Sequence, residues 1–263
     1  MIRSMVALHV GTDNLYFGHR TLAELLGHET LTGLVAMAVT GRRPSDEERE
    51  VLDAVAVSMN SADPRIWPLK LARLVASFGG TLAGYGASHL SMEGPRIGPW
   101  PAGHAARELL ALREAVGQRV DDDAGVAREV RAFLERRPRV VGLGVPLRDF
   151  DERHVALSEW IRARGRDRLP YWRLHTALGA VARAERGVGT NIVLGVAAVL
   201  LDLGYEPDQI SAVTTFLNQS VFAANSFEAA RQHDATMQDV GEAHVAYAGP
   251  PRRRSPRAEL AGR

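Results

Sequence analysis

Apolar residues recur every three or four positions through most of the chain, and no stretch alternates between apolar and polar residues for long enough to require a strand. Capping residues mark where helices begin. Thr21 and Glu24 have the spacing of a capping box, and Ser45 stands directly before three acidic residues. The pattern predicts an all-α protein of roughly a dozen helices, preceded by an extended segment over residues 1–20.

Glycine and proline interrupt this helical pattern at several places. Residues 68–90 are predicted to be helical although they contain four glycines, and residues 211–232 are predicted to form one long amphipathic helix. Breaks fall at 60–65 and at 94–101. Residues 249–263 are rich in proline and arginine with little to pack, so we predict a disordered tail there.

The composition argues against several functions. The 32 basic residues are nearly matched by 31 acidic ones, which argues against binding to nucleic acid or to an acidic membrane. The chain has no cysteine, so thiolate catalysis and Cys-ligated zinc are excluded. No histidine pair has metal-ligand spacing, and His28, His104 and His175 are predicted to lie at the surface or at helix ends. Without a signal-peptide pattern or a long apolar run, the chain is predicted to be cytoplasmic.

Two glycine-containing turns are candidate ligand-binding loops. Residues 140–153 hold two glycines and a proline, followed by a helix that begins with carboxylates, which predicts a tight loop whose backbone approaches a ligand. Residues 187–191 precede a very apolar helix, whose first N–H groups can hold an anion. A plain turn with Thr190 or Asn191 as the N-cap is the alternative. Gly144 and Asn191 are the candidate cofactor-binding residues.

The helix predicted over residues 211–232 carries an unusual mixture of side chains. Five residues at helical spacing share one face: Asn218, Val221, Phe222, Asn225 and Glu228. A solvated face rarely holds valine and phenylalanine, and a core face rarely holds two amides and a carboxylate. The mixture favours a pocket lining or a polar network between helices.

Several motifs, in order, resemble those of the citrate synthase family, and in particular its short citryl-CoA lyase-like branch. The resemblance runs from about Asp13 to Arg231. Residues 37–45 resemble "LLLTGRLPT", 94–98 resemble "GDRFGGA" and "GPLHGGA", 141–145 resemble "MGIGH", 151–153 resemble "DPR", 191–193 resemble "NVD", and 217–225 resemble "GRSMGFIGH".

The resemblance implies an all-α, citrate synthase-like fold with a large and a small helical domain. The large domain would comprise residues 1–100 and 205–248, and the small domain residues 101–204. It also implies a homodimer that packs through residues 68–90 and 211–232. The substrate would be a small molecule, such as a coenzyme A thioester, bound between the domains, with no tightly bound cofactor.

The catalytic groups of the family are replaced in this chain. The family uses an aspartate to move the α-proton of an acyl-CoA and histidines to polarise the reacting oxygens. The resemblance places Val193 at the aspartate and Val145 at one histidine, while Asn218 and Asn225 replace an arginine and a later histidine. Arg153 alone matches a family ligand, an arginine that binds a substrate carboxylate. Because valine can neither take up a proton nor donate a hydrogen bond, we expect the usual reaction to be lost.

Two functions remain open. The first is a repurposed enzyme that acts on a carboxylate or acyl thioester in an interdomain cleft lined by Val145, Val193 and Ile97, by C–C bond chemistry or related acyl chemistry. Its candidate catalytic residues are Asp63, His89 and Glu228, and its candidate substrate-binding residues are Arg65, Arg96, Arg153, Asn218 and Asn225. The replacement of family residues by polar amides, at Asn218 and Asn225, favours this enzyme.

The second is a non-catalytic relative that binds a CoA-type ligand or regulates an active homologue. One observation would separate the two functions, namely where four charged residues lie: Asp63, Arg65, Arg96 and Glu228. Convergence on one cavity would favour the repurposed enzyme, and separate ion pairs would favour the non-catalytic protein.

Overall fold

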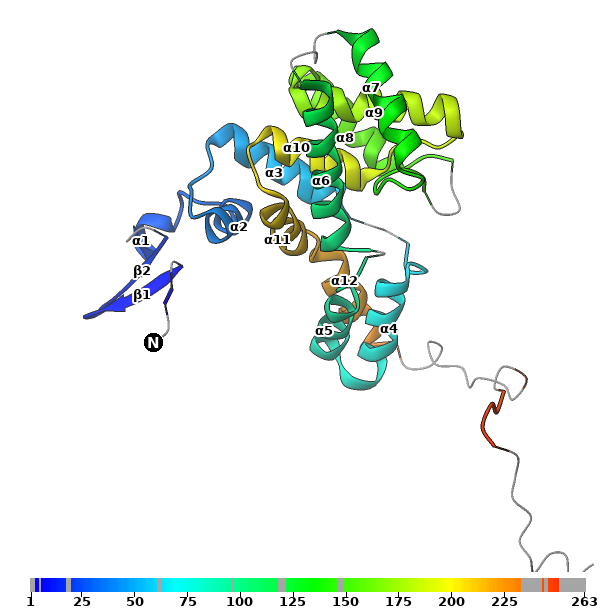
Figure 1. Ribbon diagram of the computed structural model, residues 1–263. Helices are drawn as coiled ribbons and strands as arrows, with labels where there is room; N and C mark the ends of the chain where they lie inside the picture. Colours follow the sequence, from blue (N-terminus) through cyan, green and yellow to red (C-terminus); the bar gives the residue numbers. More distant parts are fainter. Residues whose placement is uncertain are drawn as a thin grey trace, which may run out of the picture.

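The computed structural model describes residues 3–4, 6–17, 20–60, 63–95, 97–117, 122–145, 149–232, 243 and 246–250. A small N-terminal sheet projects from one side of a helical body, α7, α8 and α9 form one end of that body, and α4, α5 and α12 form the other (Figure 1). The all-α fold class is confirmed.

Helices make up most of the described chain. They are α1 (Leu22–Leu25), α2 (Leu31–Thr40), α3 (Asp46–Ser58), α4 (Trp67–Gly79), α5 (Thr81–Ser91), α6 (Pro99–Val116), α7 (Asp123–Arg136), α8 (Glu152–Ala163), the 3-10 helix η2 (Arg166–Arg168), α9 (Pro170–Arg186), α10 (Ile192–Asp202), α11 (Pro207–Leu217) and α12 (Ser220–Ala229).

The main hydrophobic core is built around α6 and α10, which pack against each other. Leu109 and Leu112 of α6 are fully buried, and α10 is apolar on every side, as expected of a helix surrounded by protein. Residues of α2, α3, α7, α8, α9 and α11 complete this core. A separate, smaller cluster joins Leu69 of α4, Met92 and Phe222 of α12.

The predicted helix starts are confirmed. Thr21 accepts a hydrogen bond from the Glu24 amide while the Glu24 carboxylate accepts one from the Thr21 amide, and Ser45 and Glu48 form a second such capping box. These contacts satisfy amide groups that have no partner inside the helix, so they fix where α1 and α3 begin.

The helical prediction for residues 68–90 is confirmed, whereas the single long helix predicted over residues 211–232 is wrong, because that segment is divided into two helices. Residues 68–90 form α4 and α5, which meet at Gly80, where φ is +82° and ψ is 178°. A Cβ on Gly84 would lie only 2.4 Å from the Ala72 carbonyl oxygen, so this glycine allows α4 and α5 to pack closely within one chain. Residues 211–232 divide at Asn218, which ends α11 instead of lying on the face of one continuous helix.

The N-terminal segment is a small antiparallel sheet that the pattern did not predict. Strand β1 (Ala7–Val10) pairs with β2 (Asp13–Tyr16) in the register Ala7↔Tyr16, and β3 (Arg20–Thr21) extends the sheet beside β2. Leu8 and Val10 share one face of β1, but all four of its residues are exposed and the strand is too short for its sequence to indicate a half-buried strand.

The domain boundaries proposed from the sequence stay a prediction. The predicted disordered tail begins at Gly249, and its residues 251–263 lie outside the described part of the chain. Within the described residues, no helix is long and apolar enough to cross a membrane.

Candidate functional site

The loop over residues 142–145 is fixed to the turn before α10 by three hydrogen bonds. The Gly144 amide donates to the Gly189 carbonyl oxygen at 2.7 Å, and the Asn191 amide donates to the Gly142 carbonyl oxygen at 2.9 Å. The Asn191 side-chain amide donates to the Gly144 carbonyl oxygen at 2.9 Å. The two turns predicted from their glycines therefore form one unit.

The two glycines of this loop differ in their surroundings. Gly142 and Gly144 both have a positive φ, at +94° and +80°. A Cβ on Gly142 would lie 2.5 Å from the Cβ of Leu194, whereas a Cβ on Gly144 would meet nothing within 4 Å. Gly142 therefore allows the loop to approach α10, and Gly144 faces open space.

The N-terminus of α10 is already occupied by groups of the protein itself. The Val193 amide donates to Asn191 Oδ1 at 3.0 Å, so Asn191 is the N-cap. The Ile192 amide donates to Asp151 Oδ2 at 3.0 Å. A carboxylate of this chain therefore stands where the sequence suggested that an anionic ligand could bind.

Asp151 is buried at 2% exposure and binds Arg153 through both of its oxygens. Arg153 Nε lies 2.9 Å from Asp151 Oδ1, and Nη2 lies 2.9 Å from Oδ2. Burial opposes ionisation, but the hydrogen bonds from Arg153 and the Ile192 amide hold the pKa of Asp151 below its usual value. Arg153, the predicted carboxylate ligand, therefore already binds a carboxylate of its own helix.

A pair of histidines, one half-buried (His154) and one buried (His175), lies behind this loop. His154 Nε2 of α8 and His175 Nε2 of α9 are 2.7 Å apart, and Thr190 Oγ1 lies 3.2 Å from the same His154 nitrogen. The prediction that His175 lies at the surface or a helix end is wrong, because it is 3% exposed within α9. It packs against the Trp172 ring, and its sequence spacing alone could not reveal this burial.

The remaining predicted residues do not meet in one place. Asp63 binds Arg65 two residues later, and Glu228 binds Arg73 of α4. His89 stacks on Tyr85, with ring centroids 4.3 Å apart, and its Nδ1 lies 3.0 Å from the Tyr85 carbonyl oxygen. Arg96 lies outside the described residues. The three candidate catalytic residues, Asp63, His89 and Glu228, therefore lie in separate local contacts.

Asn225, Glu228 and Gln232 of the last helical segment are joined by Arg73, a residue that sequence reasoning missed. Arg73 Nη1 donates to Asn225 Oδ1 at 3.2 Å and to Glu228 Oε2 at 2.5 Å, and Nη2 donates to Gln232 Oε1 at 2.6 Å. The hydrogen bond and charge of Arg73 hold the pKa of Glu228 below its usual value. The mixed face is a polar network between α4 and α12.

Asn218 lies at the α11–α12 junction among other polar contacts. Its Oδ1 is buried and has no hydrogen-bond partner among the described residues. Next to it, Gln219 Oε1 accepts a hydrogen bond from the Tyr85 hydroxyl at 2.7 Å, and the Ser220 hydroxyl donates to Asn60 Oδ1 at 2.6 Å. These contacts tie the junction to the end of α3 and to α5.

The valines and isoleucine at the family's catalytic positions belong to different parts of the structure. Val193 is half-buried and packs against the main core, whereas Ile97 packs against the smaller cluster of Met92 and Phe222. Val145 is half-buried on the 142–145 loop. These positions therefore contribute apolar contacts.

The described part of the structure has two hollows near the helices discussed above. One has a volume of about 180 Å³ and is bordered by the start of α4 and the end of α5; its lining residues are Trp67, Ser91, Met92, Glu93, Gly94, Pro95 and Ile97. This is smaller than the ~300–1,000 Å³ of pockets that enclose a drug-sized ligand. Within the described residues, no group of three or more histidine or acidic side chains is placed to hold a metal ion.

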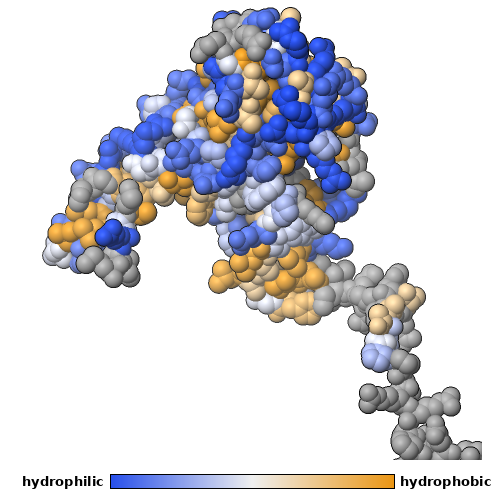
Figure 2. Space-filling view, in the orientation of Figure 1, coloured by the Kyte–Doolittle hydropathy of each residue, from blue (hydrophilic) through white to orange (hydrophobic). Residues whose placement is uncertain are grey.

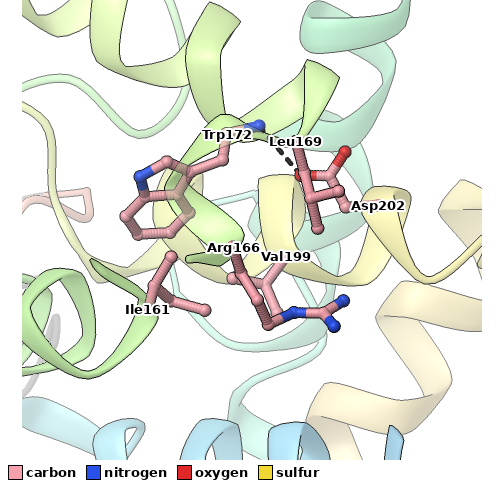
Figure 3. Close-up of a pocket in the computed structure, with 6 residues that line it drawn as sticks. All are labelled: Ile161, Arg166, Leu169, Trp172, Val199 and Asp202. Atoms are coloured by element: carbon pink, nitrogen blue, oxygen red, sulfur yellow. Dashed lines mark hydrogen bonds between the residues drawn. The ribbon is translucent and has the colours of Figure 1, made fainter. Parts of the chain in front are cut away.

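The second hollow is a narrow crevice between η2, α9 and α10 with no room for a water molecule (Figure 3). Asp202 accepts hydrogen bonds from the Tyr171 and Trp172 amides at 2.9 Å each, so the end of α10 caps the start of α9. Burial raises the pKa of Asp202 to about 6, against the effect of these two amides. The crevice therefore marks a packed contact between η2, α9 and α10, not a ligand-sized cavity.

Comparison with known proteins gives a match only at the level of structure. No protein-family model matches the sequence, and no curated protein matches it significantly. Citryl-CoA lyase from Hydrogenobacter thermophilus is similar with a TM-score of 0.80 and 20% identity, over 99% of both chains.

Two larger proteins share the fold over part of their length. ATP citrate lyase from Methanothrix soehngenii, solved with citrate and coenzyme A, is similar with a TM-score of 0.74 and 16% identity, over 95% of this chain and 42% of its own. Citrate synthase from Thermotoga maritima is similar with a TM-score of 0.57 and 17% identity, over 85% of this chain and 58% of its own. This chain therefore has a citrate synthase-like fold. Of these three proteins, citryl-CoA lyase is the one that it covers from end to end.

Proposed function

We propose that this chain is a cytoplasmic, non-catalytic relative of citryl-CoA lyase that binds an acyl-thioester metabolite. The dispersal of its ionisable groups carries the proposal. Asp63 and Glu228 are each engaged by an arginine, and His89 is held against Tyr85 and Phe222. A general acid or base must reach the proton that it transfers, and these three groups lie in separate contacts. The similarity to citryl-CoA lyase over the whole chain supports the ligand class.

The contacts of Asp151 favour a thioester over a free carboxylate as the recognised group. Asp151 binds two nitrogens of the Arg153 guanidinium and also the Ile192 amide. These are the groups through which Arg153 and the N-terminus of α10 would bind a ligand carboxylate. We expect acyl-CoA compounds to stabilise the protein more than dicarboxylates or tricarboxylates do.

The proposal predicts that the protein binds acyl-CoA compounds but does not turn them over, and both can be measured on the same samples. At a ligand concentration of 100 times Kd, we expect an acyl-CoA to raise the free energy of unfolding by about 2.7 kcal/mol, which thermal unfolding can detect. Acetyl-CoA with oxaloacetate, and citryl-CoA alone, should turn over at least about 10⁴-fold more slowly than with citryl-CoA lyase, because each lost acid or base costs ~10²–10⁴ in rate. Turnover near that of the lyase, or no binding of any CoA compound, would contradict the proposal.

A repurposed enzyme is the second candidate, and the hollow beside residues 94–97 favours it. Ser91, Glu93 and Trp67 are among its lining residues, and Glu93 is the one with an ionisable side chain. The hollow matches a small acyl group better than a whole coenzyme. Turnover of any acyl-CoA that is abolished by Glu93→Gln and retained in Asp63→Asn would favour this enzyme over the non-catalytic relative.

We also propose that the protein is a homodimer that packs through α5. Leu82, Gly86 and Leu90 recur every four residues on one side of this helix. Leu82 is 82% exposed and Leu90 is 77% exposed, and a Cβ on Gly86 would meet nothing within 4 Å. Figure 2 shows that hydrophobic residues gather over the end of the molecule formed by α4, α5 and α12. Because exposed apolar area of this kind marks an interface, a second copy is the expected partner.

Light scattering after size exclusion tests the dimer. We expect a mass of twice 28.6 kDa for the natural chain. The double variant Leu82→Glu with Leu90→Glu should fall to the monomer mass, because it would bury four carboxylates in a symmetric interface. Leu31→Glu, which changes an equally exposed leucine of α2, should stay dimeric. A monomeric natural chain would contradict the proposal.

A further inference from the structure

The pair of half-buried His154 and buried His175 takes no part in the proposed ligand binding. Their Nε2 atoms are 2.7 Å apart, so one nitrogen must carry a hydrogen and the other must accept it. This is possible only when at least one ring is neutral and its accepting nitrogen is free. A further proton on the accepting nitrogen would place two N–H groups against each other. A proton on the other nitrogen of the donating ring would keep this hydrogen bond but place a positive charge where little water reaches it. Protonation at either position therefore opposes the closed pair.

The ionisable groups around the pair offer little compensation for a bound proton. On α8, Asp151 favours a charged His154 but is already bound to Arg153 and to the Ile192 amide. On α9, Arg183 lies against Gly189 and would repel a charged imidazole. The first two turns of α10 and the loop over residues 142–145 contain no ionisable side chain.

Thr190 connects the pair to the candidate ligand-binding loop. Its hydroxyl lies 3.2 Å from His154 Nε2, on the turn before α10. The residues on either side of Thr190 hold the loop, because the Gly189 carbonyl oxygen accepts from the Gly144 amide and the Asn191 amide donates to the Gly142 carbonyl oxygen. Gly195 of α10 also packs against the His154 ring, where an added Cβ would lie 3.0 Å from Cδ2. Displacement of His154 would therefore disturb the support of this loop.

We propose that the neutral His154–His175 pair is a proton-sensitive latch, which holds the loop over residues 142–145 closed and releases it when the pair takes up a proton.

The direction of the pH effect follows from the two states. In the closed state, burial lowers the pKa of His175 to about 3 and also lowers the pKa of His154. In the open state, water reaches the rings and their pKa returns toward about 6.5. Because the open state binds more protons below about pH 6.5, acid favours opening, and above that pH the effect disappears. For one proton, the ratio of open to closed molecules rises about tenfold per pH unit.

Hydrogen exchange of the Gly144 and Asn191 amides between pH 7.5 and pH 5 tests the latch. After correction for the intrinsic exchange rate, we expect the opening equilibrium of these two amides to rise on the order of 30-fold at pH 5. The amide of Ala72 in α4, which lies outside the elements around the pair, should show no such rise. An opening equilibrium at Gly144 and Asn191 that stays constant with pH would overturn the proposal.

A matched pair of variants identifies the histidines responsible. His175→Gln keeps a group that can donate or accept a hydrogen bond but cannot take up a proton in this range, so the pH dependence at Gly144 should fall to what His154 alone contributes. His28→Gln changes an exposed histidine and should keep it. Retention of the full dependence in His175→Gln would overturn the latch.

The natural protein supplies a second measurement in case the variant does not fold. Nitrogen NMR of the imidazoles at pH 5 should show both rings neutral in the closed form. A charged ring in molecules whose Gly144 amide is still protected would overturn the proposal.

Discussion

Replacement of Asp151 by alanine is expected to lower the free energy of unfolding by about 3–5 kcal/mol. The carboxylate is 2% exposed and binds the Arg153 guanidinium, the Arg153 amide and the Ile192 amide. Its removal leaves a partly buried arginine and a buried amide without their partner, and α8 loses its N-cap. Denaturant unfolding followed by circular dichroism measures the change.

The chain contains a matched control for this variant. Asp63 and Arg65 repeat the same local arrangement, in which the arginine amide and guanidinium both bind an aspartate two residues earlier. The Arg65 side chain is 86% exposed, so solvent screens this pair. We expect Asp63→Ala to cost about 1 kcal/mol or less. Equal losses in the two variants would show that burial of Asp151 contributes little.

Substitution of Gly142 by alanine is expected to destabilise the protein by about 3 kcal/mol. The residue combines a positive φ of +94° with a position where a Cβ would lie 2.5 Å from Leu194 Cβ. The variant must therefore strain the backbone and also move the loop away from α10. Thermal or denaturant unfolding would reveal the loss.

Gly144→Ala separates these two causes. Gly144 has a similar positive φ of +80° but open space where its Cβ would be, so we expect only the backbone cost of about 1 kcal/mol. If both alanine variants lost the same stability, contact with Leu194 would not be the reason that residue 142 is a glycine.

Local signals in the sequence were sufficient to predict most helices. In the capping boxes of Thr21 with Glu24 and of Ser45 with Glu48, side chains accept hydrogen bonds from amides three residues away. Residues close in sequence therefore determine where these two helices begin. The breaks within residues 68–90 and 211–232 were harder to place. Gly80 and Asn218 end helices because of how α4, α5, α11 and α12 pack, and packing depends on residues distant in sequence. The exposed β1 strand has only four residues, too few for its apolar Leu8 and Val10 to identify it.

The candidate site was predicted less completely than the fold. The loop at Gly144 was predicted correctly, and Asn191 was one of the two residues predicted as a possible N-cap, because both features depend on local backbone geometry. Cofactor binding by these two residues stays a prediction. The partners of charged residues were not predictable. Arg73 reaches Glu228 over 155 residues, and Asp151 reaches Ile192 over 41. Spacing along one helix cannot indicate contacts between helices.

The carboxylate of Asp151 at the start of α10 has a consequence for any ligand that approaches this turn. Because it is tethered in place, it competes with an external anion at an effective concentration far above the millimolar range of flexibly linked groups. Free metabolites cannot reach such a concentration. Citrate and similar anions should therefore leave the Asp151–Ile192 contact intact. Selectivity among acyl compounds would then arise from the shape and apolar character of the acyl group.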